Sequence, residues 1–285
     1  MDCIICRYGE LALKGKNRFM FEDRLVYNLR DCLNKNSITA EIKKVRGRIF
    51  VYTSDSAAVS SLKNVFGLVS LSPAVVVESL PDAIKEKVID YAGSVVKHEK
   101  PTTFRISTKR TNKKFPKSSN ETDIFLGDAV GNTFNLKAKM KGADLDVGVE
   151  IHEKTFIFHK TIPCFGGLPV GITGNVVCLI EDEKSLAAAW LMMKRGCIVF
   201  PLGRKEKYID SLMRFSYGYD IRFTQINALS DIDGFAEKNN CRAVVVGDRF
   251  EDFELDKYGD IKTALLTPLI AYDEKMLSDL MGLIR

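Results

Sequence analysis

The chain has 285 residues, 46% of them hydrophobic and 28% charged, which is an ordinary composition for a globular protein. No run approaches the roughly 20 apolar residues of a membrane span, and the N-terminal MDCIICRYGE lacks the basic head and long apolar stretch of a signal peptide. Seven cysteines without regular spacing favour a reducing compartment. We therefore expect a cytoplasmic protein with neither a membrane anchor nor a disulfide framework.

The net charge of +5 is unevenly distributed along the chain. Residues 1–170 hold 27 Lys and Arg against 19 Asp and Glu, whereas residues 171–285 hold 15 against 18. An excess of cations attracts polyanions such as nucleic acids. The first part of the chain is therefore where we expect a polyanion to bind.

Residues 1–75 predict the order β-α-β-β-α-β, which is that of ferredoxin-like domains. Apolar alternation marks the strands, and a turn glycine, Gly47, joins two of them into a hairpin. The predicted elements are a strand over 3–8, a helix over 18–33, a hairpin over 41–46 and 48–52, a helix over 57–65 and a strand over 71–77.

Residues 76–170 predict a second domain of mixed α and β structure. It contains a loop rich in Lys, Asn, Ser and Pro, and it ends in a hairpin turning at Glu153 and Lys154. The predicted elements are helices over 81–96 and 121–134 and strands over 103–108, 144–151 and 155–159.

Residues 171–285 alternate strands and helices, which indicates a parallel sheet covered by helices. We predict an α/β fold class, with an α+β N-terminal half and a shortened Rossmann-like domain at the C-terminal end. The predicted elements of this last domain are strands over 176–180, 197–201, 221–226 and 243–247, with helices over 185–195, near 206–215 and at the C-terminus.

A stretch without acidic residues, 104–120, is the first candidate for nucleic-acid binding. Each Lys or Arg that neutralises a phosphate releases counterions, which gives a salt-sensitive affinity that does not depend on sequence. A solvated loop of ordinary surface charge explains the composition equally well. The first candidate residues are Arg105, Lys109, Arg110, Lys113, Lys114 and Lys117, and the second are Lys14, Lys16, Arg18, Arg46 and Arg48.

The segment 166–196 predicts a strand, a turn and a helix, the frame on which nucleotide loops are built. A phosphate loop needs glycines, because bare backbone amides and a helix N-terminus face the anion. Glu181, Asp182 and Glu183 stand at that turn instead. These carboxylates are expected to cap the helix dipole and to repel a triphosphate.

Several strings resemble the tRNA 4-thiouridine synthetases, the ThiI-type sulfurtransferases. RYGELALKGKNR and FGLVSLSPA resemble their N-terminal ferredoxin-like domain, and GGLPVG and LMMKRG resemble the start of their pyrophosphatase (PP-loop) domain. FRISTKRTNKKFP and DLDVGVEIHEKTFIFHKTI resemble a THUMP domain, a module of RNA-modifying enzymes. The resemblance implies a ferredoxin-like domain at 1–75, a THUMP RNA-binding domain at 76–170 and a PP-loop-like domain at 171–285. It also implies binding to the acceptor end of tRNA and a homodimer.

In that family an S-G-G-x-D-S loop binds ATP with Mg. Counted back without gaps from Leu191–Gly196, this loop falls on residues of which only the last one, Ser185, matches. The acid-rich segment 248–260 also departs from the family's G-E-S-x-G-Q-V-like motif, and we expect it to be a solvated acidic surface. We therefore predict a degenerate nucleotide loop, no bound cofactor and no assigned catalytic residue. The loop consists of Ile180, Glu181, Asp182, Glu183, Lys184 and Ser185.

The cysteines and histidines predict neither a metal site nor a catalytic dyad. Cys3 and Cys6 point to opposite faces of a strand, so they are expected to be core residues. Cys241, next to a cation, is the least implausible carrier of a persulfide. His152 and His159 flank a hairpin and are interpreted as a surface pair across the strands.

We interpret the sequence as a tRNA-binding protein of tRNA thio-modification that does not use ATP and that serves a separate sulfur-transferring or adenylating enzyme. One alternative is an active ATP-dependent tRNA sulfurtransferase with a divergent nucleotide site. A second alternative is an interaction protein of sulfur-carrier or thiamine chemistry without an RNA role.

Overall fold

The computed structural model describes residues 1–13, 15–45, 47–204, 206 and 209–284. The chain forms two compact units. Unit 1 contains residues 1–6, 50–56 and 71–162, and unit 2 contains residues 7–49, 57–70 and 163–285. No helix within the described ranges is both long and apolar enough to cross a membrane.

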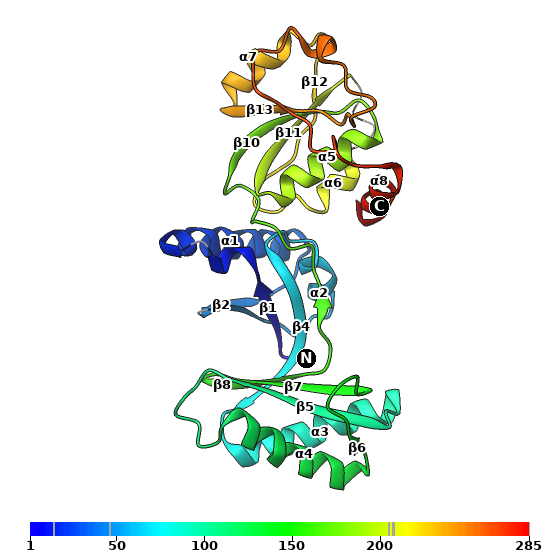
Figure 1. Ribbon diagram of the computed structural model, residues 1–285. Coiled ribbons are helices and arrows are strands. Elements are labelled where there is room, and N and C mark those ends of the chain that lie inside the picture. Colours follow the sequence, from blue (N-terminus) through cyan, green and yellow to red (C-terminus); the bar gives the residue numbers. More distant parts are fainter. Residues whose placement is uncertain (14, 46, 205, 207–208, 285) are drawn as a thin grey trace. The chain divides into compact units, whose positions relative to one another are not determined.

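The first 78 residues confirm the predicted β-α-β-β-α-β order (Figure 1). Their four strands follow one another across the sheet as β2-β3-β1-β4. The elements are β1 (Cys3–Tyr8), the short helices η1 (Glu10–Leu13) and η2 (Gly15–Asn17), α1 (Arg18–Lys35), β2 (Glu41–Val45), β3 (Arg48–Tyr52), α2 (Ala57–Leu62) and β4 (Leu68–Glu78).

The next 85 residues confirm the predicted helices and strands of the second domain. Strands β5 and β7 are parallel, β7 and β8 form the predicted hairpin, and the order in unit 1 is β4-β8-β7-β5-β6. The elements are α3 (Pro81–Glu99), β5 (Thr103–Arg110), α4 (Ser119–Phe134), β6 (Lys137–Ala138), β7 (Leu145–Ile151), β8 (Lys154–Phe158) and β9 (Ile162–Pro163).

The core of unit 1 lies between the sheet and the pair of helices α3 and α4, which lie together on one side of β5, β7 and β8 (Figure 1). Apolar side chains at helical spacing, such as Ile84 and Val88, meet the alternating residues Val147 and Val149 of the sheet. This packing places the loop between β5 and α4 at the surface of the domain.

The C-terminal part of unit 2 contains a five-stranded parallel sheet in the order β12-β11-β10-β13-β14, which confirms the predicted α/β class. The buried Trp190 packs edge-on against Phe215 in its core. The elements are β10 (Gly174–Leu179), α5 (Glu183–Lys194), β11 (Cys197–Gly203), α6 (Asp210–Met213), β12 (Thr224–Gln225), α7 (Asp231–Lys238), β13 (Cys241–Val245), η3 (Leu255–Tyr258), β14 (Leu265–Leu266) and α8 (Glu274–Ile284).

Two predicted elements of this domain are much shorter than expected. Of the helix near 206–215 only α6 forms among the described residues, and of the strand over 221–226 only β12 forms. The intervening chain turns at Gly218, where φ is +85°, and its amide donates to Asp31 Oδ2 at 2.8 Å. Tertiary hydrogen bonds therefore determine the path of this segment.

Candidate nucleic-acid interface

The cations of 104–120 fall into two groups with different surroundings. Lys109, Lys113 and Lys114 are exposed at the end of β5 and in the following loop. Arg110 is half-buried, and its Nη1 donates to the backbone oxygens of Phe115 (3.0 Å) and Lys117 (3.1 Å). Arg110 therefore holds the loop in shape, and the three lysines present charge to solvent.

The neutral residues of this segment serve the fold. Phe104 and Phe115 are 3% and 4% exposed, so neither offers a ring for a base to stack on. Ser118 begins α4 in a capping box with Glu121, with the Ser118 amide donating to Glu121 Oε2 at 2.7 Å. Asn112 Oδ1 accepts from the amide of Lys114 at 3.0 Å. Phe104, Phe115, Asn112 and Ser118 are thus engaged in the fold of this segment.

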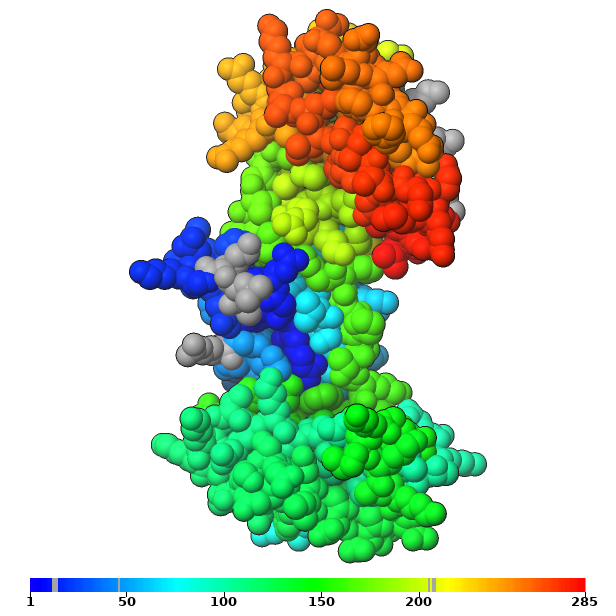
Figure 2. Space-filling view, viewed as in Figure 1, coloured from blue at the N-terminus to red at the C-terminus, as the bar shows by residue number. Residues whose placement is uncertain are grey.

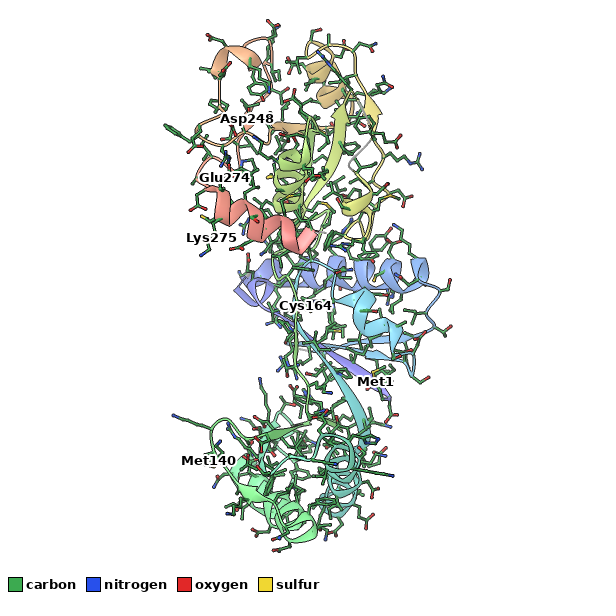
Figure 3. All side chains as sticks on the ribbon, turned by 90° about the vertical axis from the view of Figure 1, so that its right-hand side faces the viewer. Met1, Met140, Cys164, Asp248, Glu274 and Lys275 are labelled. Carbon is green, nitrogen blue, oxygen red and sulfur yellow. The ribbon has the colours of Figure 1, made fainter. Side chains whose placement is uncertain are left out.

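A groove of about 540 Å³ lies beside α4, β5 and β6, and the sequence did not lead us to predict it. The space beside Gly127 is empty, since nothing lies within 4 Å of where a Cβ would be. Arg105 lines the groove, and its buried Nε has no hydrogen-bond partner among the described residues. Met140, which is 76% exposed and labelled in Figure 3, also lines the groove. The Gly-x-x-x-Gly spacing at Gly127 and Gly131 is the one sequence signal for it.

Lys117 extends the basic surface around α4. Its Nζ lies 4.9 Å from the centroid of the Phe125 ring, and Lys85 Nζ lies 5.5 Å from the same centroid. Cations held over one ring are attracted by its quadrupole and so have restricted positions. Arg105, Lys109, Arg110, Lys113, Lys114 and Lys117 as RNA contacts remain predictions, with Arg110 now also a structural residue.

The second group of candidates is only partly described. Lys14 and Arg46 lie outside the described residues, whereas Lys16 is exposed. Arg18 is engaged, because its Nε donates to Glu22 Oε1 at 2.6 Å and its Nη2 to Tyr8 Oη at 2.7 Å. Burial, followed by the hydrogen bond to Glu22, raises the pKa of Tyr8 above its usual value.

The Tyr8 hydroxyl also joins this network to the hairpin. It accepts from the amide of Gly47 at 3.1 Å, and Arg48 Nη1 donates to the Gly47 carbonyl at 2.8 Å. The network therefore fixes the turn between β2 and β3, and both Arg18 and Arg48 contribute to the local structure. Their contact with RNA remains a prediction.

The predicted nucleotide loop joins β10 to α5 and is closed by its own side chains. Asp182 caps α5, with its Oδ1 accepting from the amide of Ser185 at 2.9 Å. Ser185 Oγ accepts from the amides of Glu181 (3.2 Å) and Asp182 (3.4 Å). Three backbone amides of this loop, which would face the anion in a phosphate loop, are thus bonded to the loop's own side chains.

Ion pairs connect this loop to the acid-rich segment 248–260, which lies at the surface of unit 2 (orange in Figure 2). Lys184 Nζ lies 2.8 Å from Asp252 Oδ2, and Lys257 Nζ lies 2.7 Å from Glu181 Oε2. The hydrogen bond from Lys184 lowers the pKa of Asp252. Glu251, Asp252, Glu254, Asp256 and Asp260 of this segment are exposed, as expected of a solvated acidic surface, and Asp252 is also paired with Lys184.

The chain after β13 also packs directly against the start of α5. A Cβ at Gly247 would lie 2.6 Å from the amide nitrogen of Ser185, so only glycine fits there. Next to this closed turn, a cavity of about 680 Å³ lies at the carboxyl ends of β10, β11 and β12, the edge at which open α/β sheets bind ligands. Its lining includes Ile180, Glu181, Gly203, Arg204, Ile226 and Lys257.

All seven cysteines are free thiols, and five of them are buried. Cys3 and Cys6 are fully buried, which confirms them as core residues. Burial raises the pKa of the Cys241 thiol to about 11, whereas persulfide chemistry needs a thiolate. No cluster of three or more metal-ligating side chains occurs within the described ranges.

The interpretation of His152 and His159 as a cross-strand pair is wrong. Strands β7 and β8 pair Ile151 with Thr155 and Gly148 with Phe158, so the two histidines are not opposite each other. His152 is hydrogen-bonded to Thr111 Oγ1 at 2.8 Å, and His159 to Tyr91 Oη at 2.6 Å.

Comparison with known proteins agrees with this architecture. Residues 3–72 match the ThiI ferredoxin-like domain, and residues 81–159 match the THUMP domain. A probable tRNA sulfurtransferase of Caldanaerobacter subterraneus subsp. tengcongensis is 38% identical over 199 residues, which cover 68% of this chain and 51% of that protein. The chain thus spans about half the length of the curated relatives it matches.

Solved structures extend the similarity to the whole chain. The crystal structure of PH1313 from Pyrococcus horikoshii Ot3 is 28% identical with a TM-score of 0.91, covering 100% of this chain and 99% of that one. A 4-thiouridine synthetase, solved as an RNA complex with bound ATP, shares the fold at 22% identity and a TM-score of 0.88, with 100% and 85% coverage.

The ferredoxin-like and THUMP domains together make this chain a protein of the THUMP class. It belongs to the ThiI-type tRNA sulfurtransferase family, as the resemblance predicted.

Proposed function

We propose that this protein binds the acceptor end of tRNA through its THUMP and ferredoxin-like domains, and that it serves tRNA thio-modification of the 4-thiouridine type. The observation that carries the proposal is the set of exposed lysines, Lys109, Lys113 and Lys114, on a THUMP domain in a segment without acids. Clustered cations on a folded surface give the electrostatic affinity that RNA binding requires.

The C-terminal domain acts in this proposal without ATP. Asp182 occupies the anion position at the start of α5, and Glu181 and Glu183 add negative charge around it. We infer that the domain is a docking platform for a separate sulfur-transferring or adenylating enzyme, or the contact surface of a homodimer.

The test is a titration of the full chain with intact tRNA and with the same tRNA lacking its single-stranded 3′ end, at several salt concentrations. Salt-dependent binding that weakens on trimming supports an acceptor-end RNA-binding protein. No binding, or equal binding to any polyanion, contradicts it and favours the interaction protein of sulfur-carrier or thiamine chemistry.

The cavity at the ends of β10, β11 and β12 favours one rival, an active sulfurtransferase with a divergent nucleotide site. That rival requires saturable ATP binding and adenylation of tRNA. Equilibrium dialysis with labelled ATP distinguishes it from our proposal independently of the tRNA titration.

A further inference from the structure

Helix α1 exposes large apolar side chains on one side. Phe19, Met20 and Tyr27 are 59%, 50% and 53% exposed. Single exposed apolar residues are ordinary, but residues seven apart on a helix return to nearly the same side, as Met20 and Tyr27 do, and Phe19 lies beside Met20. Asp23 lies between them, and Arg30 and Asn34 continue this side three and seven residues after Tyr27, so a strip along α1 mixes rings with polar and charged groups.

Tyr27 in this strip is positioned by its neighbours. The guanidinium carbon of Arg24 lies 5.0 Å from the centroid of the Tyr27 ring. Arg24 is itself fixed, because its Nε donates to Val170 O at 2.7 Å and its Nη2 to Gly218 O at 2.9 Å. A ring that is held against a fixed cation and remains half-exposed loses little entropy when a flat partner stacks on it.

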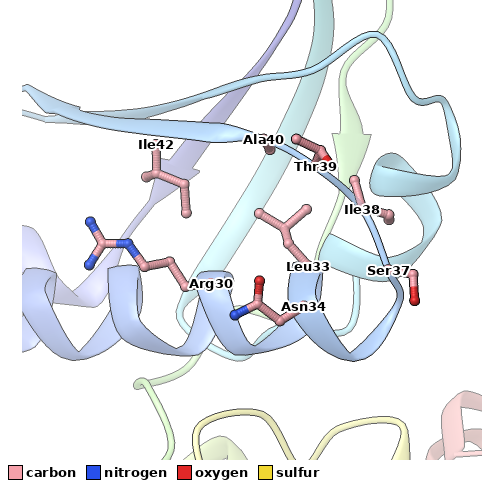
Figure 4. Close-up of a pocket in the computed structure, with 8 residues that line it drawn as sticks. All are labelled: Arg30, Leu33, Asn34, Ser37, Ile38, Thr39, Ala40 and Ile42. Atoms are coloured by element: carbon pink, nitrogen blue, oxygen red, sulfur yellow. The ribbon is translucent and has the colours of Figure 1, made fainter.

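A hollow of about 510 Å³ continues the strip toward β2 (Figure 4). Arg30 and Asn34 point from α1 toward the strand that carries Ile42. Because Arg30 follows Tyr27 by three residues, its guanidinium can contact the sugar-phosphate of a base stacked on the ring. The hollow thus offers apolar walls and polar groups: Leu33, Ile38 and Ile42 with Asn34, Ser37 and Thr39.

The exposed charges around the strip favour a negatively charged partner. Asp23 and Glu41 are the acids there, and they pair with Lys44 and Lys43. Arg30 and Lys16 add further exposed cations. A second copy of this chain placed symmetrically on this surface would bring like charges together, whereas RNA complements them.

We propose that this α1 strip, Phe19, Met20, Tyr27, Arg30 and Asn34, is a second RNA contact that stacks an unpaired nucleotide of the bound tRNA on Tyr27 and holds its phosphate with Arg30. The inference rests on the proposed function and identifies a part of the tRNA-binding surface outside the THUMP domain. Stacking on an aromatic ring accepts any base, so this contact adds affinity without sequence preference.

The test compares full-length variants Tyr27→Ala, Tyr27→Trp and Arg30→Ala, with Met276→Ala as a control of similar exposure on α8. Each is titrated with tRNA over a salt series, and each protein alone is examined by sedimentation. We expect Tyr27→Ala to weaken binding about tenfold without changing the salt slope, because stacking releases no counterions. Tyr27→Trp should bind as the wild type does, and Arg30→Ala should lower the slope by about one.

Unchanged affinity of Tyr27→Ala, in a protein whose wild type binds tRNA, overturns the strip and leaves the proposed function intact. A changed sedimentation coefficient with unchanged RNA affinity assigns the strip to a protein interface and also overturns it. A wild type that binds no tRNA overturns the proposed function and the strip together.

Discussion

Lys109, Lys113 and Lys114 differ from Arg110 in what surrounds their charges. The lysines are exposed, whereas Arg110 donates to two backbone oxygens of its own loop. A charge that already satisfies backbone acceptors contributes less to an ionic contact, and its removal disturbs the loop. The three lysines are therefore the residues whose substitution separates RNA binding from folding.

We predict that the triple substitution of Lys109, Lys113 and Lys114 by Ala weakens tRNA binding and lowers the salt slope by about two to three, since each lost phosphate contact removes nearly one released counterion. The same charge change at Lys238, Lys262 and Lys275, exposed in the C-terminal domain, serves as control and should leave the slope unchanged. Filter binding over a salt series measures both. Equal slopes for the two triple variants would place the RNA contact elsewhere.

The role of a residue in the candidate site was predictable where its partner lies close to it in the sequence. Three carboxylates at a helix start predict self-capping, and Asp182 caps α5. The partners of Lys184 and Lys257 were not predictable, because they lie 68 and 76 residues away in sequence. The burial of Phe104 and Phe115 was not predictable either, since it depends on packing that a loop-like composition conceals.

At the scale of elements, the spacing of apolar residues and the positions of turn residues predicted the helices and strands of the first two domains well. Strand β5 alternates half-exposed and buried residues over its first four positions, and β7 is buried except at Asp146. Helix α4 begins at a capping box that is readable in the sequence. The segment around Gly218 failed because its path depends on hydrogen bonds from Arg24 and to Asp31 of α1. Local propensity carries no information about such distant partners.

Because the path of this segment depends on α1, we predict that Gly218→Ala lowers the free energy of unfolding. The residue has φ +85°, and an added Cβ would lie 1.9 Å from Asn28 Oδ1. The backbone conformation alone costs about 1–2 kcal/mol in any L-residue, and the overlap adds to it. Gly234→Ala in α7, where a Cβ meets nothing within 4 Å, is the matched control and should raise the free energy of unfolding by up to about 1 kcal/mol. Denaturant unfolding compares the two, and equal stabilities would contradict the assigned role of Gly218.

At the scale of the whole molecule, the two ends of the chain differ in net charge, and the turn before α5 is occupied by its own side chains. The basic excess lies within residues 1–170, and residues 171–285 carry a small acidic excess. The C-terminal domain keeps the five-stranded parallel sheet, while its first turn is closed by Asp182, Ser185 and the pair of Lys184 with Asp252. Backbone amides at the turn before α5 are thus already occupied by side chains of the same turn.

We therefore predict that tRNA binding by this protein is independent of ATP. A triphosphate at the start of α5 would have to displace the Asp182 carboxylate from the Ser185 amide and approach Glu181 and Glu183 in the same turn. The carboxylates of this turn repel the negatively charged phosphates of ATP at close range, and Mg²⁺ bound to ATP neutralises only part of that charge. Calorimetric titration with MgATP should give no saturable signal, and MgATP at millimolar concentration should leave the affinity for tRNA unchanged. A saturable isotherm, or an affinity for tRNA that rises with MgATP, would mean that the closed turn opens and that the cavity beside β10 holds a nucleotide after all.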